Sequence, residues 1–130
     1  MKSRIIPFLS LFLFLVSFVA PVTAARGNSA DVRIRLAPTA DIRGKATAKY
    51  RNRGGEREFQ VEVEVARRLA GAVFLVAVDG EAVGEVTINA FGKGRLSLNN
   101  QRGDLVPEVV RGSVVEIVSE SGIVVFAGRF

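Results

Sequence analysis

The amino-acid sequence predicts an all-β protein: a single antiparallel β-sandwich or small barrel of about seven or eight short strands, after an N-terminal signal peptide. Apolar and polar residues alternate with a period of two along much of the chain, which is typical of half-buried strands. No window of helical length keeps a 3.6-residue period. Glycines recur between the alternating runs, where tight turns require them. Many short strands separated by turns favour a sandwich or a barrel.

The predicted signal peptide covers residues 1–24. Lys2 and Arg4 precede an apolar run, and small residues lead to a cleavage site after Ala24. The run is shorter than the about 20 apolar residues that a membrane span needs, so we expect cleavage rather than a retained anchor helix. The sequence therefore predicts a secreted or periplasmic protein that meets the membrane only through the signal peptide before cleavage.

A short flexible leader is expected at residues 25–30, followed by one β domain at 31–130. Its first strand is the stretch "DVRIRLA", which Pro38 ends. This strand places alternate side chains on opposite faces. The apolar face holds Val32, Ile34 and Leu36, and the polar face holds Asp31, Arg33 and Arg35.

Residues 43–65 predict a hairpin, because two alternating runs flank the Gly-rich stretch "NRGG". If residues 52–55 form a four-residue loop, basic residues of the first strand face mostly acidic residues of the second. Such opposed pairs stabilise a sheet by about 0.2–1 kcal/mol each. The expected pairs are Arg51 with Glu56, Lys49 with Glu58, Thr47 with Gln60, Lys45 with Glu62, and Arg43 with Glu64.

The remaining strands follow in the same manner. "AGAVFLVAVDG" reads as an inner strand that ends in an Asp-Gly turn, and "AVGEVTINA" returns from it. "GRLSLNN" alternates again, and "QRGDLVPEVVRGS" is an irregular crossing. "VVEIVS" and "IVVFAGRF", joined by the turn "ESG", complete the domain.

The sequence contains no Cys and no His. This composition excludes a Cys nucleophile, a Ser-His pair and a zinc site built from His or Cys. We therefore expect a protein that is not an enzyme and has no cofactor and no bound metal. Two alternatives stay open: a hydrolase that uses carboxylates on loops, and a small outer-membrane β-barrel, whose terminal strand often ends in Phe as this chain does at Phe130.

Charge is distributed unevenly along the chain. Residues 26–57 carry nine Lys or Arg and three acidic residues, whereas residues 58–130 carry seven and ten. The predicted hairpin neutralises most of this basic half, and what remains is a loose positive patch that serves as a possible binding surface. Its residues are Arg33, Arg35, Arg51, Arg53 and Arg57.

Three further motifs resemble known sites. "FGKG" lacks the first Gly and the Ser or Thr of a phosphate-binding loop and has strands on both sides, so it predicts a turn. "DGEAVGE", around Asp79, lacks the oxygen ligands of a calcium loop at their set spacing. Arg102, Gly103 and Asp104 form the tripeptide that integrins recognise, and they are a weaker candidate for a binding loop.

The order "VDGEAVGEVTINAFGKGRLSL", "GDLVPEVVRGSVVEI" and "GIVVFAGRF" resembles small secreted bacterial β-rich modules of unknown function. The resemblance covers about residues 69–130 and rests on glycines, turns and core valines. It implies one compact β domain and no catalytic residue. The sequence thus predicts an exported module with a binding or structural role, whose partner is a protein or an envelope polymer; nucleic acid is not an expected partner.

Overall fold

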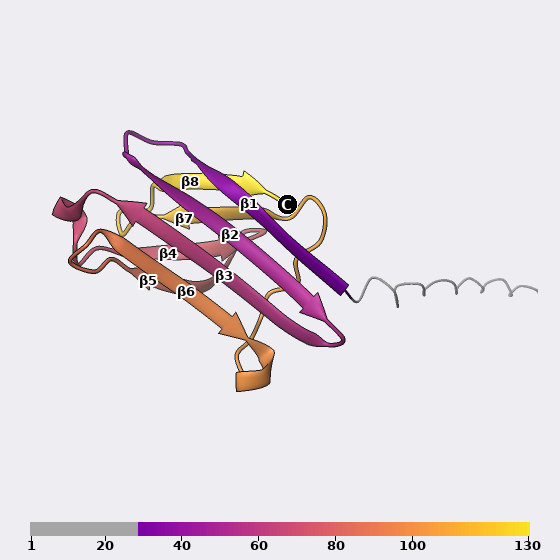
Figure 1. Ribbon diagram of the computed structural model, residues 1–130. Coiled ribbons are helices and arrows are strands. Elements are labelled where there is room, and N and C mark those ends of the chain that lie inside the picture. Colours follow the sequence, from indigo (N-terminus) through magenta and orange to yellow (C-terminus); the bar gives the residue numbers. More distant parts are fainter. Residues whose placement is uncertain (1–28) are drawn as a thin grey trace, which may run out of the picture.

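The computed structural model describes residues 29–130, which form eight β-strands and two short 3₁₀ helices (Figure 1). This confirms the predicted all-β class. The elements in chain order are β1 (Ser29–Pro38), β2 (Gly44–Arg53), β3 (Glu56–Val65), η2 (Arg67–Leu69), β4 (Val73–Val78), β5 (Glu81–Thr87), β6 (Lys93–Asn99), η3 (Asn100–Arg102), β7 (Val114–Val118) and β8 (Val124–Arg129).

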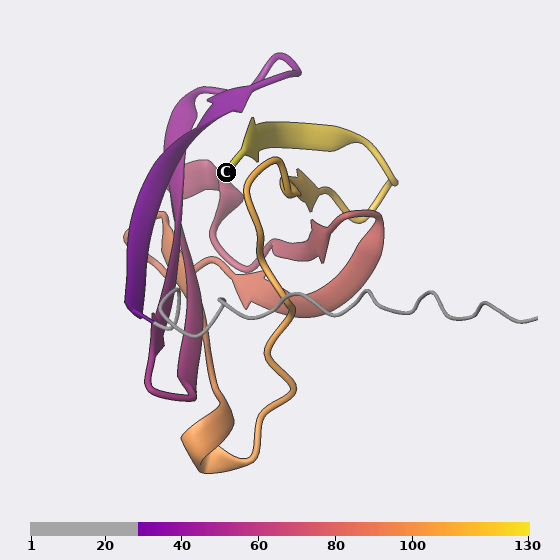
Figure 2. The same ribbon diagram turned by 90° about the vertical axis from the view of Figure 1, so that its right-hand side faces the viewer.

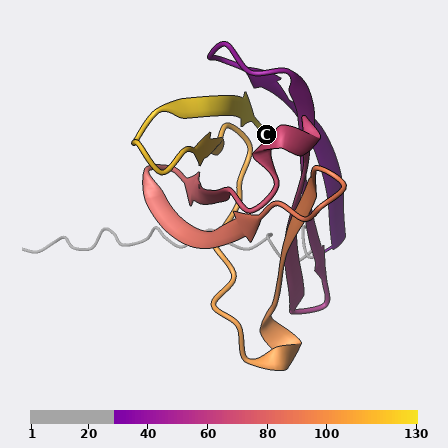
Figure 3. The ribbon, with the colours of Figure 1, turned by 90° about the vertical axis from the view of Figure 1, so that its left-hand side faces the viewer.

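The eight strands form one antiparallel sheet in the order β5-β4-β7-β8-β1-β2-β3-β6. The sheet coils into a nearly closed barrel. Figure 2 shows β1, β2, β3 and β6 as one wall, while β5, β4, β7 and β8 curve round to face it, and Figure 3 shows the same closure from the opposite side. Of the two architectures that the sequence allows, the barrel is therefore the observed one.

The barrel interior is filled by the apolar side of the alternating strands. Phe59, Phe126 and Leu36 are its largest fully buried side chains. Valines and isoleucines from β3, β4, β5 and β7 pack around them. The irregular crossing between η3 and β7 adds Val106 and Val109, which are buried although the segment has no regular structure. A single apolar core thus supports the whole described domain.

The β2–β3 hairpin is present, but the predicted loop is wrong by two residues. Arg53 pairs with Glu56, so the connection is the two-residue loop Gly54–Gly55 rather than residues 52–55. Both glycines have positive φ, +57° and +93°, as a type I′ turn requires. A shift of two residues keeps every side chain on its predicted face, because side chains alternate with a period of two.

The shift changes every expected cross-strand pair of this hairpin. The residues of β2 that had a predicted partner each lie opposite a residue two positions further along β3, and Arg43, which was expected to face Glu64, lies before the start of β2. The observed pairs are Arg53 with Glu56, Arg51 with Glu58, Lys49 with Gln60, Thr47 with Glu62, and Lys45 with Glu64.

The sheet edges β5 and β6 contact each other without a hydrogen-bonded ladder. Glycines make this close approach possible. A Cβ on Gly94 of β6 would lie 2.4 Å from Val86 Cγ1 and 2.7 Å from the carbonyl oxygen of Thr87, both on β5. A Cβ on Gly84 of β5 would meet only the flexible end of Leu96, at 2.8 Å. The absence of side chains at these two positions allows the barrel to close.

The predicted signal peptide, residues 1–24, lies outside the described residues. β1 begins at Ser29, so the last two residues of the predicted leader belong to this strand. Among residues 29–130, no helix has the length and apolar character needed to span a membrane.

Candidate functional site

The outer face of the wall formed by β1, β2, β3 and β6 carries most of the charged side chains of these strands. Cross-strand register arranges them in rows that run across the wall. One row is Asp31, Arg51, Glu58 and Asn99; the next is Arg33, Lys49, Gln60 and Ser97; the third is Arg35, Thr47, Glu62 and Arg95; the fourth is Lys45, Glu64 and Lys93.

The carboxylates in these rows already have cationic partners. Glu58 pairs with Arg51, and the Glu58 carboxylate also accepts a hydrogen bond from Gln60 at 2.8 Å. Glu62 pairs with Arg95 at 2.8 Å. The two remaining carboxylates, Asp31 and Glu64, pair with Arg53 at 3.3 Å and with Lys45 at 3.8 Å.

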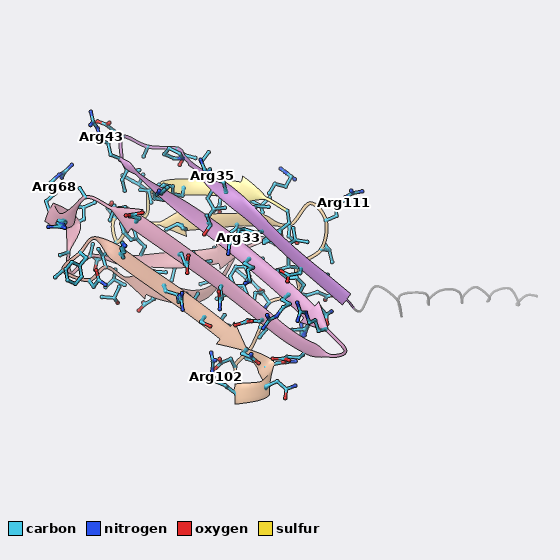
Figure 4. All side chains as sticks on the ribbon, viewed as in Figure 1. Arg33, Arg35, Arg43, Arg68, Arg102 and Arg111 are labelled. Atoms are coloured by element: carbon cyan, nitrogen blue, oxygen red, sulfur yellow. The ribbon has the colours of Figure 1, made fainter. Side chains whose placement is uncertain are left out.

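Four cations on this face have no ion pair among the described residues: Arg33, Arg35, Lys49 and Lys93. Lys93 lies at the β6 edge of the wall, opposite Glu64. The other three lie in two adjacent rows on β1 and β2, and we call them the basic strip. Arg33 lies directly opposite Lys49, and Arg35 lies opposite the neutral Thr47. Arg33 and Arg35 are exposed along β1 (Figure 4), and Lys49 is half-buried. Directly opposed like charges destabilise a sheet, so the fold retains an unfavourable pair here.

The other three basic residues proposed from the sequence bind other residues of the domain. Arg51 and Arg53 are in the ion pairs given above. Arg57 points to the inner side of the sheet, where its guanidinium donates to the carbonyl oxygen of Val106 at 3.5 Å. Arg33 and Arg35 therefore lie near Lys49 and have no ion pair among the described residues. The other three arginines of the predicted patch already bind partners within the domain.

Lys49 is the residue of this surface that sequence reasoning missed. The expected four-residue loop placed Lys49 opposite Glu58, which would have neutralised it, but its partner on β3 is Gln60. The signal that could have found it is the pair Gly54–Gly55, since two adjacent glycines between alternating strands are typical of a two-residue type I′ loop.

Arg102, Gly103 and Asp104 form a compact turn after β6. Arg102 donates to the Asp104 carboxylate at 3.0 Å and to the carbonyl oxygen of Ser97 at 2.9 Å. Asp104 also accepts from the backbone N–H of Asn99 at 3.0 Å, and Gly103 has a φ of +86°. The charged groups of the tripeptide thus bind each other and the end of β6, and this role in holding the turn explains why they are charged.

The first half of the "FGKG" motif, Phe91 and Gly92, lies in the turn between β5 and β6 as predicted, whereas Lys93 and Gly94 already belong to β6. The side-chain oxygen of Asn89 accepts from the backbone N–H of Phe91 at 2.9 Å and from that of Lys93 at 3.1 Å. Gly92 has a φ of +82°, which only glycine adopts readily. Lys93 is exposed at the first position of β6.

The carboxylate of Asp79 also has a structural role. It accepts from the backbone N–H of Val114 at 2.9 Å and so ties the β4–β5 turn to β7. Within residues 29–130, no three acidic side chains come together as a metal site would require.

The surface of the described domain is hollowed in more than one place, and two of these concavities bear on the choice of site. One, of about 450 Å³, lies over the ion pairs of β2, β3 and β6 and includes Lys45, Glu62, Glu64 and Arg95. The other, of about 430 Å³, is more apolar and lies where the β1–β2 connection, η2 and the β7–β8 turn meet; its lining includes Ile42, Leu69, Phe74 and Val125. Arg43 and Arg68 line the second together with Asp41 and Glu120, so its charges balance and select no class of ligand.

Comparison with known proteins finds no protein-family model that matches the chain and no curated protein similar enough to count as a relative. The basic strip is the candidate site, because fold stability does not explain two cations directly opposite each other.

Proposed function

We propose that this protein is an exported, non-enzymatic binding module whose basic strip holds an acidic partner in the periplasm or outside the cell. The observation that carries the proposal is the position of Arg33, which lies opposite Lys49 and beside Arg35 and has no ion pair among residues 29–130. The acidic residues in the rows of this wall are already in ion pairs, so the excess positive charge is directed to solvent. An acidic protein segment or envelope polymer would supply the missing negative charge.

The surrounding sheet suits this role. Arg33 and Arg35 project from one strand of a wall that is fixed by β2 and, further in, by β3 and β6. A rigid strand holds two guanidinium groups at a set spacing, so that less conformational entropy is lost when a partner binds. The export signal in the sequence supports a place of action outside the cytoplasm.

The test is the affinity of the chain from residue 25 to 130 for fluorescent polyglutamate at low and physiological salt. The variant R33E/R35E is compared with R68E/R111E, which changes the net charge by the same amount. Arg68 and Arg111 are also exposed and have no ion pair among the described residues, and they lie away from the strip (Figure 4). We expect R33E/R35E to lose binding about tenfold or more, and R68E/R111E to stay close to wild type.

Equal losses in the two variants would mean that polyglutamate responds only to net charge, and this result would contradict the proposal. Failure of the unmodified chain to bind at low salt would contradict it as well, because screening is weakest there.

A further inference from the structure

β1 has a free edge beside the basic strip. Along most of its length, β1 pairs with β2 on one side. On its other side it pairs with β8 only through Ala37 and Pro38. Next to this pairing, Gly128 of β8 lies against Leu36 and the carbonyl oxygen of Arg35. Within the described residues, the stretch 31–34 has no paired strand on that side, and Figure 1 shows β1 extending beyond the end of β8.

The register shows which backbone groups this edge presents. In a hairpin with a two-residue loop, the residues that flank the loop form a hydrogen-bonded pair, here Arg53 and Glu56. Hydrogen-bonded pairs then alternate, so the odd-numbered residues of β2 bond to β3 and the even-numbered ones bond to β1. Their partners Val32 and Ile34 therefore bond to β2.

The odd-numbered residues of β1 consequently direct their N–H and C=O groups away from β2. The end of the strand agrees with this parity: Ala37 pairs with Ala127 of β8, and the N–H of Thr39 donates to the carbonyl oxygen of Val125 at 3.0 Å. By the same parity, the free edge offers the backbone groups of Asp31 and Arg33, whereas the carbonyl oxygen of Arg35 lies close to Gly128 of β8.

We propose that the acidic partner is an extended polypeptide segment that adds to β1 as a further strand, a refinement that rests on the function proposed above. Arg33 supplies free backbone groups, and Arg33 and Arg35 both supply guanidinium groups that have no ion pair among the described residues. Strand addition uses both, since the backbone provides affinity and alternate side chains provide specificity. An acidic residue opposite Arg33 would also relieve its repulsion from Lys49.

Alternation defines the rest of the partner segment. Its acidic residues lie on the outer face, opposite Arg33 and Arg35. Its intervening residues lie on the inner side with Val32, which is 44% exposed. Apolar residues fit these intervening positions, so the segment alternates acidic and apolar side chains. A second copy of this chain fits less well, because it would bring the two basic strips together.

The experiment measures binding of fluorescent peptides that alternate Glu and Val to the chain from residue 25 to 130. One peptide is unmodified, one carries N-methyl groups on its Glu amides, and one carries them on its Val amides. Residues opposite Arg33 on the outer face direct their N–H groups to β1, and the intervening residues direct theirs away. We expect N-methylation of Glu to weaken binding about tenfold or more, and N-methylation of Val to leave it near that of the unmodified peptide.

A second comparison changes the protein instead. Arg33→Ala and Arg33→Pro both remove the guanidinium, but only proline also removes the outward N–H and blocks the edge. The N–H of Arg33 takes no part in the β1–β2 ladder, so proline is compatible with the strand. We expect Arg33→Pro to bind the unmodified peptide more weakly than Arg33→Ala.

The outcomes separate this proposal from the previous one. Equal affinities of the two methylated peptides, whether both are retained or both lost, would overturn strand addition. So would a peptide that does not bind while polyglutamate binds through Arg33 and Arg35, and so would a dimer of the chain that the peptide fails to displace. Failure of both polyglutamate and the unmodified peptide to bind would overturn the proposed function itself.

Discussion

At the scale of single residues, the position of Arg33 directly opposite Lys49 sets the basic strip apart from the rest of the wall. Neighbouring rows contain Arg51 with Glu58 and Arg95 with Glu62, in which opposite charges are paired. A carboxylate at position 33 would complete the same arrangement with Lys49. The sequence has Arg there, which sacrifices local stability and provides unpaired positive charge.

Arg33→Glu is therefore expected to make the domain more stable while it weakens binding of an acidic partner. Reversing the charge replaces a repulsive cross-strand pair with an attractive one, which is worth about 0.2–1 kcal/mol. The free energy of unfolding from urea titrations measures this change, and the gain should shrink at high salt. Arg35→Glu is the matched control: it lies opposite the uncharged Thr47 and should gain less. A loss of stability in Arg33→Glu at low salt would show that Arg33 and Lys49 do not repel each other.

Sequence reasoning located Arg33 and Arg35 because strand parity alone decides which face they occupy. It could not separate them from Arg51, Arg53 and Arg57, since that distinction depends on which residue lies opposite each one. Which residue lies opposite a given arginine depends on the register of the strands and on long-range packing. The contact from Arg57 to Val106 joins a hairpin to the irregular crossing, and no local pattern predicts it.

At the scale of elements, the two-residue turn Gly54–Gly55 determines the register of the β2–β3 hairpin. The alternating pattern predicted both strands and their buried faces correctly, because these depend only on parity. It did not determine the loop length, because loops of two and of four residues leave the same faces buried. The glycine pair was the local signal for the shorter loop.

Gly54→Asn is expected to stabilise the domain by about 0.4–1 kcal/mol. Asparagine accepts positive φ better than most residues and is the preferred first residue of a type I′ turn, and it restricts the unfolded chain more than glycine does. A Cβ at Gly54 meets nothing within 4 Å. Thermal unfolding gives the measurement, and Gly54→Val, which tolerates positive φ poorly, should destabilise. If Asn and Val had equal effects, the type I′ turn would be the wrong description.

The observed register also predicts energetic coupling between Arg51 and Glu58. This pair is more buried than the other ion pairs of the wall, with side-chain exposures of 28% and 12%. A double-mutant cycle with alanine should give a coupling of about 0.5–1 kcal/mol in the free energy of unfolding. The cycle for Lys49 and Glu58, which a four-residue loop would place opposite each other, should give a smaller value. A larger coupling energy for Lys49 with Glu58 than for Arg51 with Glu58 would instead support the four-residue loop.

At the scale of the whole molecule, the barrel has two places where the hydrogen-bonded ladder is interrupted, and they differ in kind. Between β5 and β6 the strands contact each other through glycine backbones, so that seam is closed by packing. Between β1 and β8 the ladder ends at Ala37, and the stretch 31–34 continues without a paired strand on that side among the described residues. The second place is the one beside the basic strip.

Gly94→Ala is expected to destabilise the domain by about 1–3 kcal/mol, because the new methyl group would overlap Val86 and the backbone of Thr87. Gly84→Ala should cost less, since Leu96 can turn its side chain away. Urea unfolding of both variants tests how tightly the seam is packed. Equal and negligible losses would mean that β5 and β6 lie further apart in solution.

Amide chemical-shift mapping of the ¹⁵N-labelled chain with the alternating Glu-Val peptide measures directly where an acidic segment binds. We predict that the largest shifts fall on residues 31–35 of β1, with smaller ones on the facing part of β2, and that they vanish in R33E/R35E. Shifts centred on the apolar concavity beside η2, or spread evenly over all exposed cations, would contradict the assignment of the basic strip as the binding surface.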